Sequence, residues 1–374
     1  MNATIKDIAR AAHVSYATVS RALNNKYGVK PATRQKIQGI AKRLNYHPNA
    51  IARGLVTRQT RTVGLILPDI TNPFFPEVAR GIEDGAQEQG YSVFLCNTNW
   101  ERQREQSYIK LLTEKRVDGL LIAPISNSTD SLDDGLPEEI PVVYVSNAPA
   151  NTARSYVAID SVRGGFIAAA HLLDLGHRKL GFIGAVESSL AVDERLEGFK
   201  MAHARAGIEV CERYIQLGHF RQETGYETMR RMIEAGDYPR AIFAENDIIA
   251  LGVIQAVRDC GLSVPADVAV VGFDDIPLAS LREIGLTTVY QPKYEMGKMG
   301  VQILLEEILA GSGGESGISS DVRPRRIVLE PQLIVRSTTV AAAMGAKGTA
   351  AAASEDAPRD THGFAHGVEA RAPG

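Results

Sequence analysis

Five residues near the amino terminus have side chains whose types and spacing suit contacts with double-stranded DNA. Arg21 carries a planar guanidinium that can donate to both O6 and N7 of guanine, and the short side chain of Ala17 can contact a thymine methyl group. The hydroxyl groups of Thr18 and Ser20 suit phosphate oxygens, which fix position rather than sequence. Tyr16 would stand beside Ala17 at the same exposed helix start. The alternative interpretation is an ordinary solvated surface.

Two short helices joined by a tight turn would position these side chains. Thr4 and Asp7 form a capping-box pattern that predicts the start of a first helix. A turn at His13 follows, and Ser15 is a preferred N-cap residue for a second helix that would carry the DNA contacts. Pro31, which suits a first helical turn, predicts a third helix. This arrangement is a helix-turn-helix, whose second helix enters the major groove.

The charge distribution favours a polyanionic partner for this part of the chain. The first 61 residues carry twelve Lys or Arg and a single acidic residue, Asp7, for a formal charge of +11. The whole chain has a formal charge of −3, so the remaining residues carry −14. A small basic domain joined to a larger acidic body is typical of nucleic-acid binding. Composition alone leaves open a basic targeting or solvating segment.

Beyond residue 62 the sequence alternates short apolar runs with amphipathic segments such as 76–89 and 101–116. The apolar runs lie at residues 63–67, 93–96, 119–122, 142–145, 180–183, 241–243 and 268–271, and further strands are expected at 214–217 and 286–290. Strands that alternate with helices predict parallel sheets covered by helices on both faces. Because roughly 280 residues exceed one comfortable sheet, we expect an α/β body of two subdomains.

These features resemble the lactose-repressor (LacI) family of bacterial transcription regulators. Residues 18–24 (TVSRALN), residues 44–49 (LNYHPN) and the pair Asn246-Asp247 carry the resemblance, which extends from Thr4 to about Thr339. It implies a small all-α helix-turn-helix domain and an α/β, periplasmic-binding-protein-like (type I) body of two Rossmann-like subdomains. We expect a DNA-binding domain at 1–48, a hinge helix and linker at 49–61, an effector-binding and dimerisation domain at 62–340 and a disordered tail at 341–374. The DNA contacts expected in the first domain are Thr4, Ser15, Tyr16, Ala17, Thr18, Ser20, Arg21 and Asn24.

The resemblance also implies that the segment after Pro48 is a hinge helix that forms on operator DNA and enters the minor groove. Asn49, Ala52 and Leu55 are the contacts expected there. Leu55 falls where the family places an intercalating leucine, and an apolar wedge of this kind can kink a base step. Ala52 would let two such helices approach closely. The alternative is a plain linker.

In the implied fold a ligand binds in the cleft between the two subdomains, at the carboxyl ends of the strands. Phe74 and Phe75 follow the first apolar run, where their rings could stack on a sugar. Guanidinium, amide and carboxylate groups would pair with its hydroxyl groups, since a buried unpaired polar group costs about 1–3 kcal/mol. Arg195 is expected at a helix start. The expected effector contacts are Asn72, Phe74, Phe75, Ser146, Arg195, Phe220, Asn246, Asp274 and Gln291.

Some of these positions have competing interpretations. The two phenylalanines could belong to the core, Asp247 is better explained as a helix cap than as a ligand contact, and Asp275 could stabilise a turn. The cleft positions match ribose-type binding proteins one by one, which favours a pentose-like sugar. Ser146 and Asn147 depart from that pattern, which carries an acid after the fourth strand. The identity of the sugar is therefore open, and a nucleobase could use the same aromatic walls.

Other features argue against other classes of protein. The start of the chain has no apolar stretch typical of a secretory signal, and no window approaches the roughly 18 apolar residues needed to span a bilayer. The three cysteines are far apart, so neither a disulfide framework nor a metal site is expected. Asp274 and Asp275 are adjacent and should point apart, which argues against paired catalytic carboxylates. Trp100 is interpreted as a lone aromatic residue.

We therefore expect a sequence-specific transcription regulator, a repressor controlled by a small sugar-like effector. It should act in the cytoplasm with the nucleoid, need no cofactor and catalyse no reaction. The tail holds no Leu or Ile and cannot form the leucine-heptad tetramer of some relatives, so a homodimer on a pseudo-palindromic operator is expected. Two rivals remain: a sugar-binding receptor that does not bind DNA, and a carbohydrate-processing enzyme, which would turn its ligand over.

Overall fold

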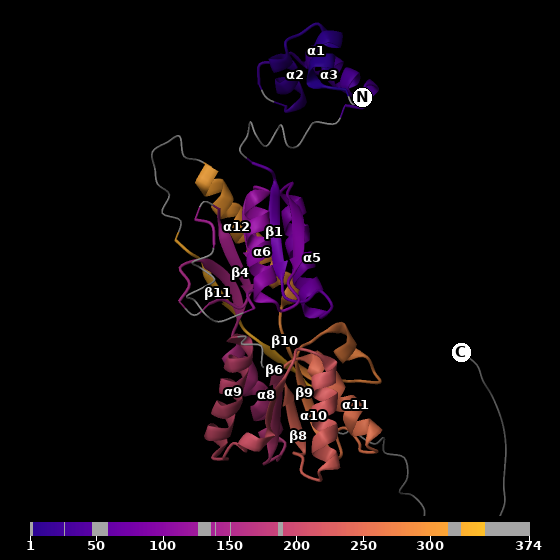
Figure 1. Ribbon diagram of the computed structural model, residues 1–374, viewed down its shortest axis with the longest axis vertical. Coiled ribbons are helices and arrows are strands. Elements are labelled where there is room, and N and C mark those ends of the chain that lie inside the picture. Colours follow the sequence, from indigo (N-terminus) through magenta and orange to yellow (C-terminus); the bar gives the residue numbers. More distant parts are fainter. Residues whose placement is uncertain are drawn as a thin grey trace, which may run out of the picture. The chain divides into compact units, whose positions relative to one another are not determined.

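The computed structural model describes a small helical domain and two α/β lobes (Figure 1). The described residues are 3–25, 27–46, 59–125, 136–138, 140–149, 151–185, 190–312 and 323–340. The predicted hinge contacts Asn49, Ala52 and Leu55, and the predicted tail, lie outside these ranges. Within the described ranges, no helix combines the length and the apolar character needed to cross a lipid bilayer.

The helical domain consists of α1 (Ile5–Ala12), α2 (Tyr16–Leu23) and α3 (Pro31–Arg43). The Thr4 N–H and hydroxyl both donate to Asp7 Oδ2, at 2.9 and 2.7 Å, which caps α1. The chain then turns at His13, whose φ is 56°. The Ser15 hydroxyl accepts from the Thr18 N–H at 3.2 Å and caps α2. The helix-turn-helix predicted from these capping residues is confirmed.

The first lobe is built on a six-stranded sheet with the order β11-β5-β4-β3-β1-β2, in which every pairing is parallel. Its strands are β1 (Thr62–Leu67), β2 (Ser92–Asn97), β3 (Gly119–Ile122), β4 (Val142–Ser146), β5 (Ser155–Ile159) and β11 (Arg326–Leu329). Helices α5 (Phe74–Glu88) and α12 (Lys293–Ser312) cover the face that carries Leu65. Helix α6 (Arg102–Glu114) covers the opposite face, against Ile66. Successive residues of β1 thus enter different cores, as strand geometry requires.

The second lobe repeats this plan with the order β12-β10-β9-β8-β6-β7. Its strands are β6 (Leu180–Ala185), β7 (Ile215–Gly218), β8 (Ala241–Ala244), β9 (Ala269–Asp274), β10 (Thr287–Tyr290) and β12 (Gln332–Ile334), of which only β12 pairs antiparallel. Helices α8 (Ser161–Asp174) and α9 (Leu190–Ala206) pack on the face that carries Phe182. Helices α10 (Gln222–Glu234) and α11 (Asp247–Asp259) pack on the face that carries Ile183. The predicted α/β class with two sheet-based subdomains is confirmed.

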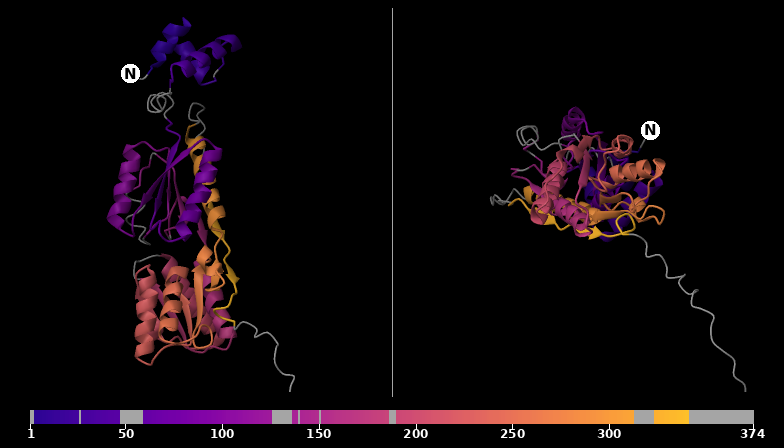
Figure 2. Two further views of the ribbon diagram at one scale, coloured as in Figure 1. Left: turned by 90° about the vertical axis from the view of Figure 1, so that its right-hand side faces the viewer. Right: turned by 90° about the horizontal axis from the view of Figure 1, so that it is seen from below.

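The chain passes from one lobe to the other three times. It crosses between β5 and α8, between β10 and α12, and between β11 and β12. The orange-to-yellow part of the ribbon in Figure 2 follows the last two crossings beside both lobes. Strands β5, β11 and β12 were not predicted from the sequence. Each lobe is therefore completed by residues from the carboxyl-terminal part of the chain.

Three pairs of helices pack through glycines that face each other's backbone, including α8 with α9 and α10 with α11, which lie side by side in Figure 1. A Cβ atom at Gly165 of α8 would lie 2.1 Å from the carbonyl oxygen of Arg195 on α9. A Cβ atom at Gly198 of α9 would lie 2.0 Å from the carbonyl oxygen of Val162 on α8. The corresponding glycines are Gly225 and Gly252 between α10 and α11, and Gly81 and Gly297 between α5 and α12. A larger residue at any of them would push two helices apart.

The Gly165→Ala variant tests this packing constraint. It should lower the free energy of unfolding by about 1–3 kcal/mol, because the added methyl group meets a backbone that cannot rotate away. Chemical denaturation of the purified protein measures the change. Gly39→Ala is the matched control, since a Cβ atom at this exposed helical position meets nothing within 4 Å. Equal stability of the Gly165→Ala variant and the wild type would contradict the constraint.

Glu105 is a buried carboxyl group inside α6. Its Oε1 accepts from the Ile125 N–H at 3.3 Å, and its Oε2 has no hydrogen-bond partner among the described residues. Burial raises the pKa of Glu105 from 4.5 to about 7. The folded protein therefore holds this proton more tightly than the unfolded chain does.

Glu105→Gln should change the pH dependence of stability. A raised pKa gives stability that is fully present below pH 4.5 and lost as the pH rises to about 7. The substitution should remove part of this decline, leaving the variant about 1–3 kcal/mol more stable than the wild type at pH 8. Urea unfolding between pH 4.5 and 8 measures both slopes. Identical slopes would show that Glu105 does not hold this proton.

Candidate functional site

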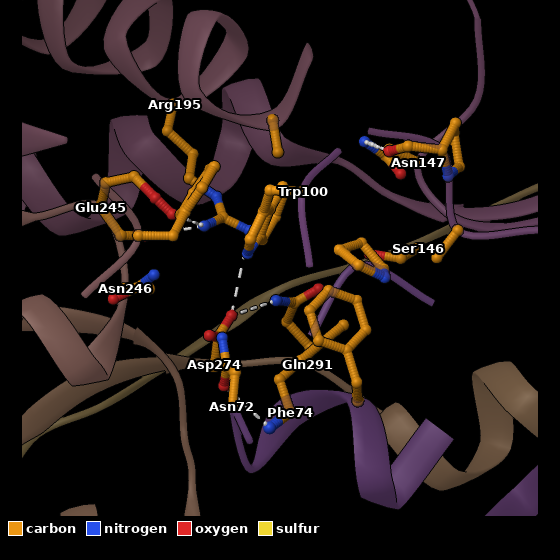
Figure 3. A pocket seen from close by; sticks show the side chains of 16 residues that line it. Asn72, Phe74, Trp100, Ser146, Asn147, Arg195, Glu245, Asn246, Asp274 and Gln291 are labelled. Carbon is orange, nitrogen blue, oxygen red and sulfur yellow. Dashed lines mark hydrogen bonds and ion pairs between the residues drawn. The ribbon is translucent and has the colours of Figure 1, made fainter. Parts of the chain in front are cut away.

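One cavity is lined by residues that follow the carboxyl ends of strands in both lobes (Figure 3). All nine residues predicted as effector contacts line it: Asn72, Phe74, Phe75, Ser146, Arg195, Phe220, Asn246, Asp274 and Gln291. The others are Pro68, Trp100, Ala123, Pro124, Asn147, Ala191 and Glu245. The rule that parallel sheets gather ligand-binding residues at their carboxyl ends therefore located these side chains correctly in space.

Buried charges form one side of the cavity. Arg195 of α9 donates from Nη1 to the Glu245 carbonyl oxygen at 2.7 Å and to Glu245 Oε1 at 3.1 Å. Its Nη2 lies 3.9 Å from Asp274 Oδ1 at the end of β9, and its guanidinium lies 3.7 Å from the centroid of the Phe273 ring. Glu245 follows β8 and was missed from the sequence, although it stands directly before the predicted Asn246. The guanidinium is thus held in one orientation from three sides.

Burial raises the pKa of Asp274 to about 6, against the opposing effects of Arg195 and Lys293. Lys293 Nζ donates to the Asp274 carbonyl oxygen at 2.5 Å. The Asp274 side chain lines the cavity, where its oxygen atoms can accept hydrogen bonds from ligand hydroxyl groups. It already accepts one from Gln291 Nε2 at 2.6 Å.

Four amide side chains line the cavity, those of Asn72, Asn147, Asn246 and Gln291, and two of them accept hydrogen bonds from N–H groups in the first turns of helices. Asn72 Oδ1 accepts from the Phe74 N–H at 3.0 Å at the start of α5. Asn246 Oδ1 accepts from the Ile249 N–H at 2.8 Å at the start of α11. Gln291 Oε1 is buried and has no hydrogen-bond partner in the described part of the chain. Gln291 thus presents an acceptor that a ligand could use.

The aromatic side of the cavity differs from the sequence interpretation in one residue. Phe74 and Phe75 belong to the core of the first lobe and also line the cavity, while their stacking on a ligand stays a prediction. Trp100, interpreted as a lone aromatic, stacks on Phe220 with ring centroids 4.0 Å apart, and that interpretation was wrong. Trp100 follows β2, so the rule applied to the other strands would have found it.

Three further details correct the sequence interpretation. Arg195 lies in the second turn of α9, which begins at Leu190, rather than at a helix start. Asp247 does not cap α11, because Asn246 does; its buried carboxylate instead accepts from the Ile276 N–H at 2.9 Å and from the Thr288 hydroxyl. Asp275 forms an ion pair with Arg336 at 2.8 Å, in agreement with a structural role.

The described candidate DNA-contacting residues lie on or next to α2 in the chain, except Thr4, which precedes α1. Tyr16 is 67% exposed and Arg21 is exposed, whereas Ala17, Thr18 and Ser20 are half-buried. Thr4 and Ser15 make the capping interactions of α1 and α2. Asn24 follows α2 and donates to the Ser20 hydroxyl at 3.4 Å. Tyr16, Arg21 and Asn24 therefore present exposed side chains that could enter a groove.

Comparison with known proteins gives matches over both parts of the chain. Residues 4–49 match the model of the bacterial regulatory proteins of the lacI family, and residues 169–339 match that of the periplasmic binding protein-like domain. The chain is 37% identical over 339 residues to the HTH-type transcriptional repressor PurR of Photobacterium profundum, covering 90% of this chain and 98% of that protein. It is 38% identical to the ribose operon repressor of Escherichia coli, over 82% of this chain and 93% of that protein.

A solved structure of the lac repressor dimer bound to operator and the anti-inducer ONPF is similar to this fold. The TM-score is 0.80 at 27% identity, and the match covers 91% of this chain and all of that one. The relatives are DNA-binding transcriptional repressors, and the likeness includes the helix-turn-helix and both lobes. The chain belongs to the lacI family of bacterial regulatory proteins.

Proposed function

We propose that this protein is a transcriptional repressor whose binding to operator DNA is controlled by a small polyhydroxylated effector in the cavity. One observation carries the proposal. A helix-turn-helix with an exposed contact face and a buried cavity with aromatic and polar walls occur together in one chain of this family. A coupling of about 1–3 kcal/mol between the two sites would change operator affinity roughly 5- to 150-fold.

The proposal divides the chain by task. Residues 1–48 contact the major groove, and residues 49–61 form the hinge, with Asn49, Ala52 and Leu55 at the minor groove. Residues 62–340 bind the effector and dimerise. The protein would act with the nucleoid in the cytoplasm, as a binding protein rather than an enzyme.

A sugar is the effector that the cavity chemistry favours. Phe75 and Phe220 supply flat apolar surfaces, while Arg195, Asp274 and Gln291 supply the donors and acceptors that hydroxyl groups need. Solved relatives carry ribose in one case and cellobiose in another. A nucleobase is the second candidate, because the same two rings could stack on a heterocycle.

A homodimer would let two helix-turn-helix domains contact the two half-sites of a pseudo-palindrome. The surface of the first lobe supports this expectation. Strand β2 lies at the sheet edge, where Phe94 and Leu95 are 51% and 44% exposed. Leu111 of α6 is 42% exposed. An apolar edge strand is a liability unless another chain covers it, and we infer that a second copy does so.

Operator recognition is tested by enriching fragmented genomic DNA on the purified protein at about 0.15 M salt. The wild type should recover a shared pseudo-palindrome. Arg21→Ala should weaken binding to that sequence by about 1–3 kcal/mol and relax the preference at one base pair of each half-site. Lys42 is an exposed cation at the end of α3, and Lys42→Ala should weaken binding to the specific sequence and binding to random-sequence DNA by the same factor. An unchanged base preference in the Arg21→Ala variant would contradict the proposed contact.

Effector recognition is tested with D-ribose as the probe. Gln291→Leu keeps the size of the side chain but removes its donor and acceptor, so ribose affinity should fall by about 1–3 kcal/mol, roughly 5- to 150-fold. Isothermal titration calorimetry measures the affinity, and Gln302→Leu, on the exposed surface of α12, is the matched control. Equal affinity of the Gln291→Leu variant and the wild type would remove Gln291 from the binding site. Absence of ribose binding to the wild type would reject ribose as the effector.

A further inference from the structure

Trp100 lies inside the cavity and contacts both aromatic walls. Its ring is stacked on that of Phe220, with 4.0 Å between centroids and 14° between planes, and it meets Phe75 edge-on at 6.2 Å. Phe75 belongs to the first lobe and Phe220 to the second. The indole therefore occupies the space between the two surfaces on which a flat ligand would stack. Figure 3 shows Trp100 close to Arg195 and in the midst of the lining side chains.

The indole fills this space without satisfying the polar groups around it. Trp100 Nε1, Arg195 Nε and Gln291 Oε1 are buried and have no hydrogen-bond partner within the described ranges. Arg195 is 6% exposed and Gln291 is 1% exposed. Buried polar atoms without a hydrogen-bond partner are rare, and a ligand with hydroxyl or amide groups could supply the missing hydrogen bonds. The indole thus occupies the stacking surface, whereas the polar atoms around it still lack hydrogen-bond partners in the described part of the chain.

The backbone that carries Trp100 is held in place, so the side chain is the part that can move. The Thr98 N–H donates to the Leu67 carbonyl oxygen at 2.9 Å, and the Trp100 N–H donates to the Pro68 carbonyl oxygen at 3.3 Å. Asn99 and Trp100 have φ angles of 55° and 60°. This left-handed conformation is uncommon for a bulky residue and persists only where the surroundings impose it. Rotation of the indole about its side-chain bonds would open the cavity without disturbing this anchor.

We propose that Trp100 is an internal competitor of the effector. In the ligand-free protein its indole covers Phe220, and a flat, polar ligand binds there when the indole rotates away. The inference rests on the proposed function of the cavity and adds a residue that sets effector affinity. If the covered form predominates, the observed affinity equals the intrinsic affinity multiplied by the fraction of uncovered molecules.

The covered state is tested without any ligand, because Trp100 is the single tryptophan of the chain. Its fluorescence in the wild type should be protected from acrylamide. Phe220→Leu removes the stacking partner and should raise the quenching constant by at least about twofold. Phe166→Leu, the same substitution at a half-buried ring of α8 that does not line the cavity, should leave it unchanged. Equal quenching in the Phe220→Leu variant and the wild type would overturn the proposal.

The competition is tested by ribose titration of two Trp100 variants. Trp100→Leu should bind D-ribose about tenfold more tightly than the wild type if nine molecules in ten are covered. Trp100→Phe keeps a flat ring and should stay close to the wild type. Weaker binding by Trp100→Leu than by Trp100→Phe would make Trp100 a ligand contact and overturn the proposal. If no form binds ribose, the sugar assignment fails, while the quenching result still decides whether Trp100 covers Phe220.

Discussion

The close approach of helices through facing glycines is the constraint on which the cavity depends. Each of the three glycine-mediated pairs contains a helix that begins beside the cavity. Helix α5 brings Phe74 and Phe75, α9 brings Arg195, and α11 is capped by Asn246. The contact is most direct at Gly165, which faces the backbone of Arg195 itself. At these crossings the backbone of one helix contacts the backbone of the other. Side-chain rearrangement therefore cannot easily shift the helices, and the cavity residues on them keep their positions.

The charged side of the cavity uses this rigidity. Burying Arg195, Glu245 and Asp274 is unfavourable unless each charge meets its partners in a fixed geometry. The hydrogen bonds from Arg195 to Glu245 and from Gln291 to Asp274 provide much of that geometry. A network that is only partly satisfied keeps donor and acceptor capacity for a ligand. Preorganisation of this kind lets a small polar molecule bind without ordering the protein around it.

Sequence reasoning located most of the cavity because the underlying rules are local. Capping residues such as Ser15 mark helix starts, and apolar runs mark strands whose carboxyl ends converge. Trp100 and Glu245 also follow strands, β2 and β8, so the rule reaches them, but their contacts with Phe220 and Arg195 become visible only in the folded protein. Asn246 and Asp247 are both suitable N-cap residues. In the structure Asn246 is the cap, and the Asp247 carboxyl group instead accepts a hydrogen bond from the buried Thr288 hydroxyl. Strands β11 and β12 are three or four residues long and depend on partners more than 40 residues away in sequence, so no local pattern predicts them.

The order of the crossings has a consequence for synthesis on the ribosome. The sheet of the first lobe begins at residue 62, but α12, which covers one of its faces, begins only at Lys293, after β6–β10 of the second lobe. At about 5–20 residues per second, the part of that face that α12 covers stays open on the order of ten seconds after β5 is made, with only α5 packed on the face. When α12 is complete, the second lobe lacks only the three-residue β12. The lobe encoded first therefore waits for a long helix from the far end of the chain, and the open part of its apolar sheet needs protection until α12 is made.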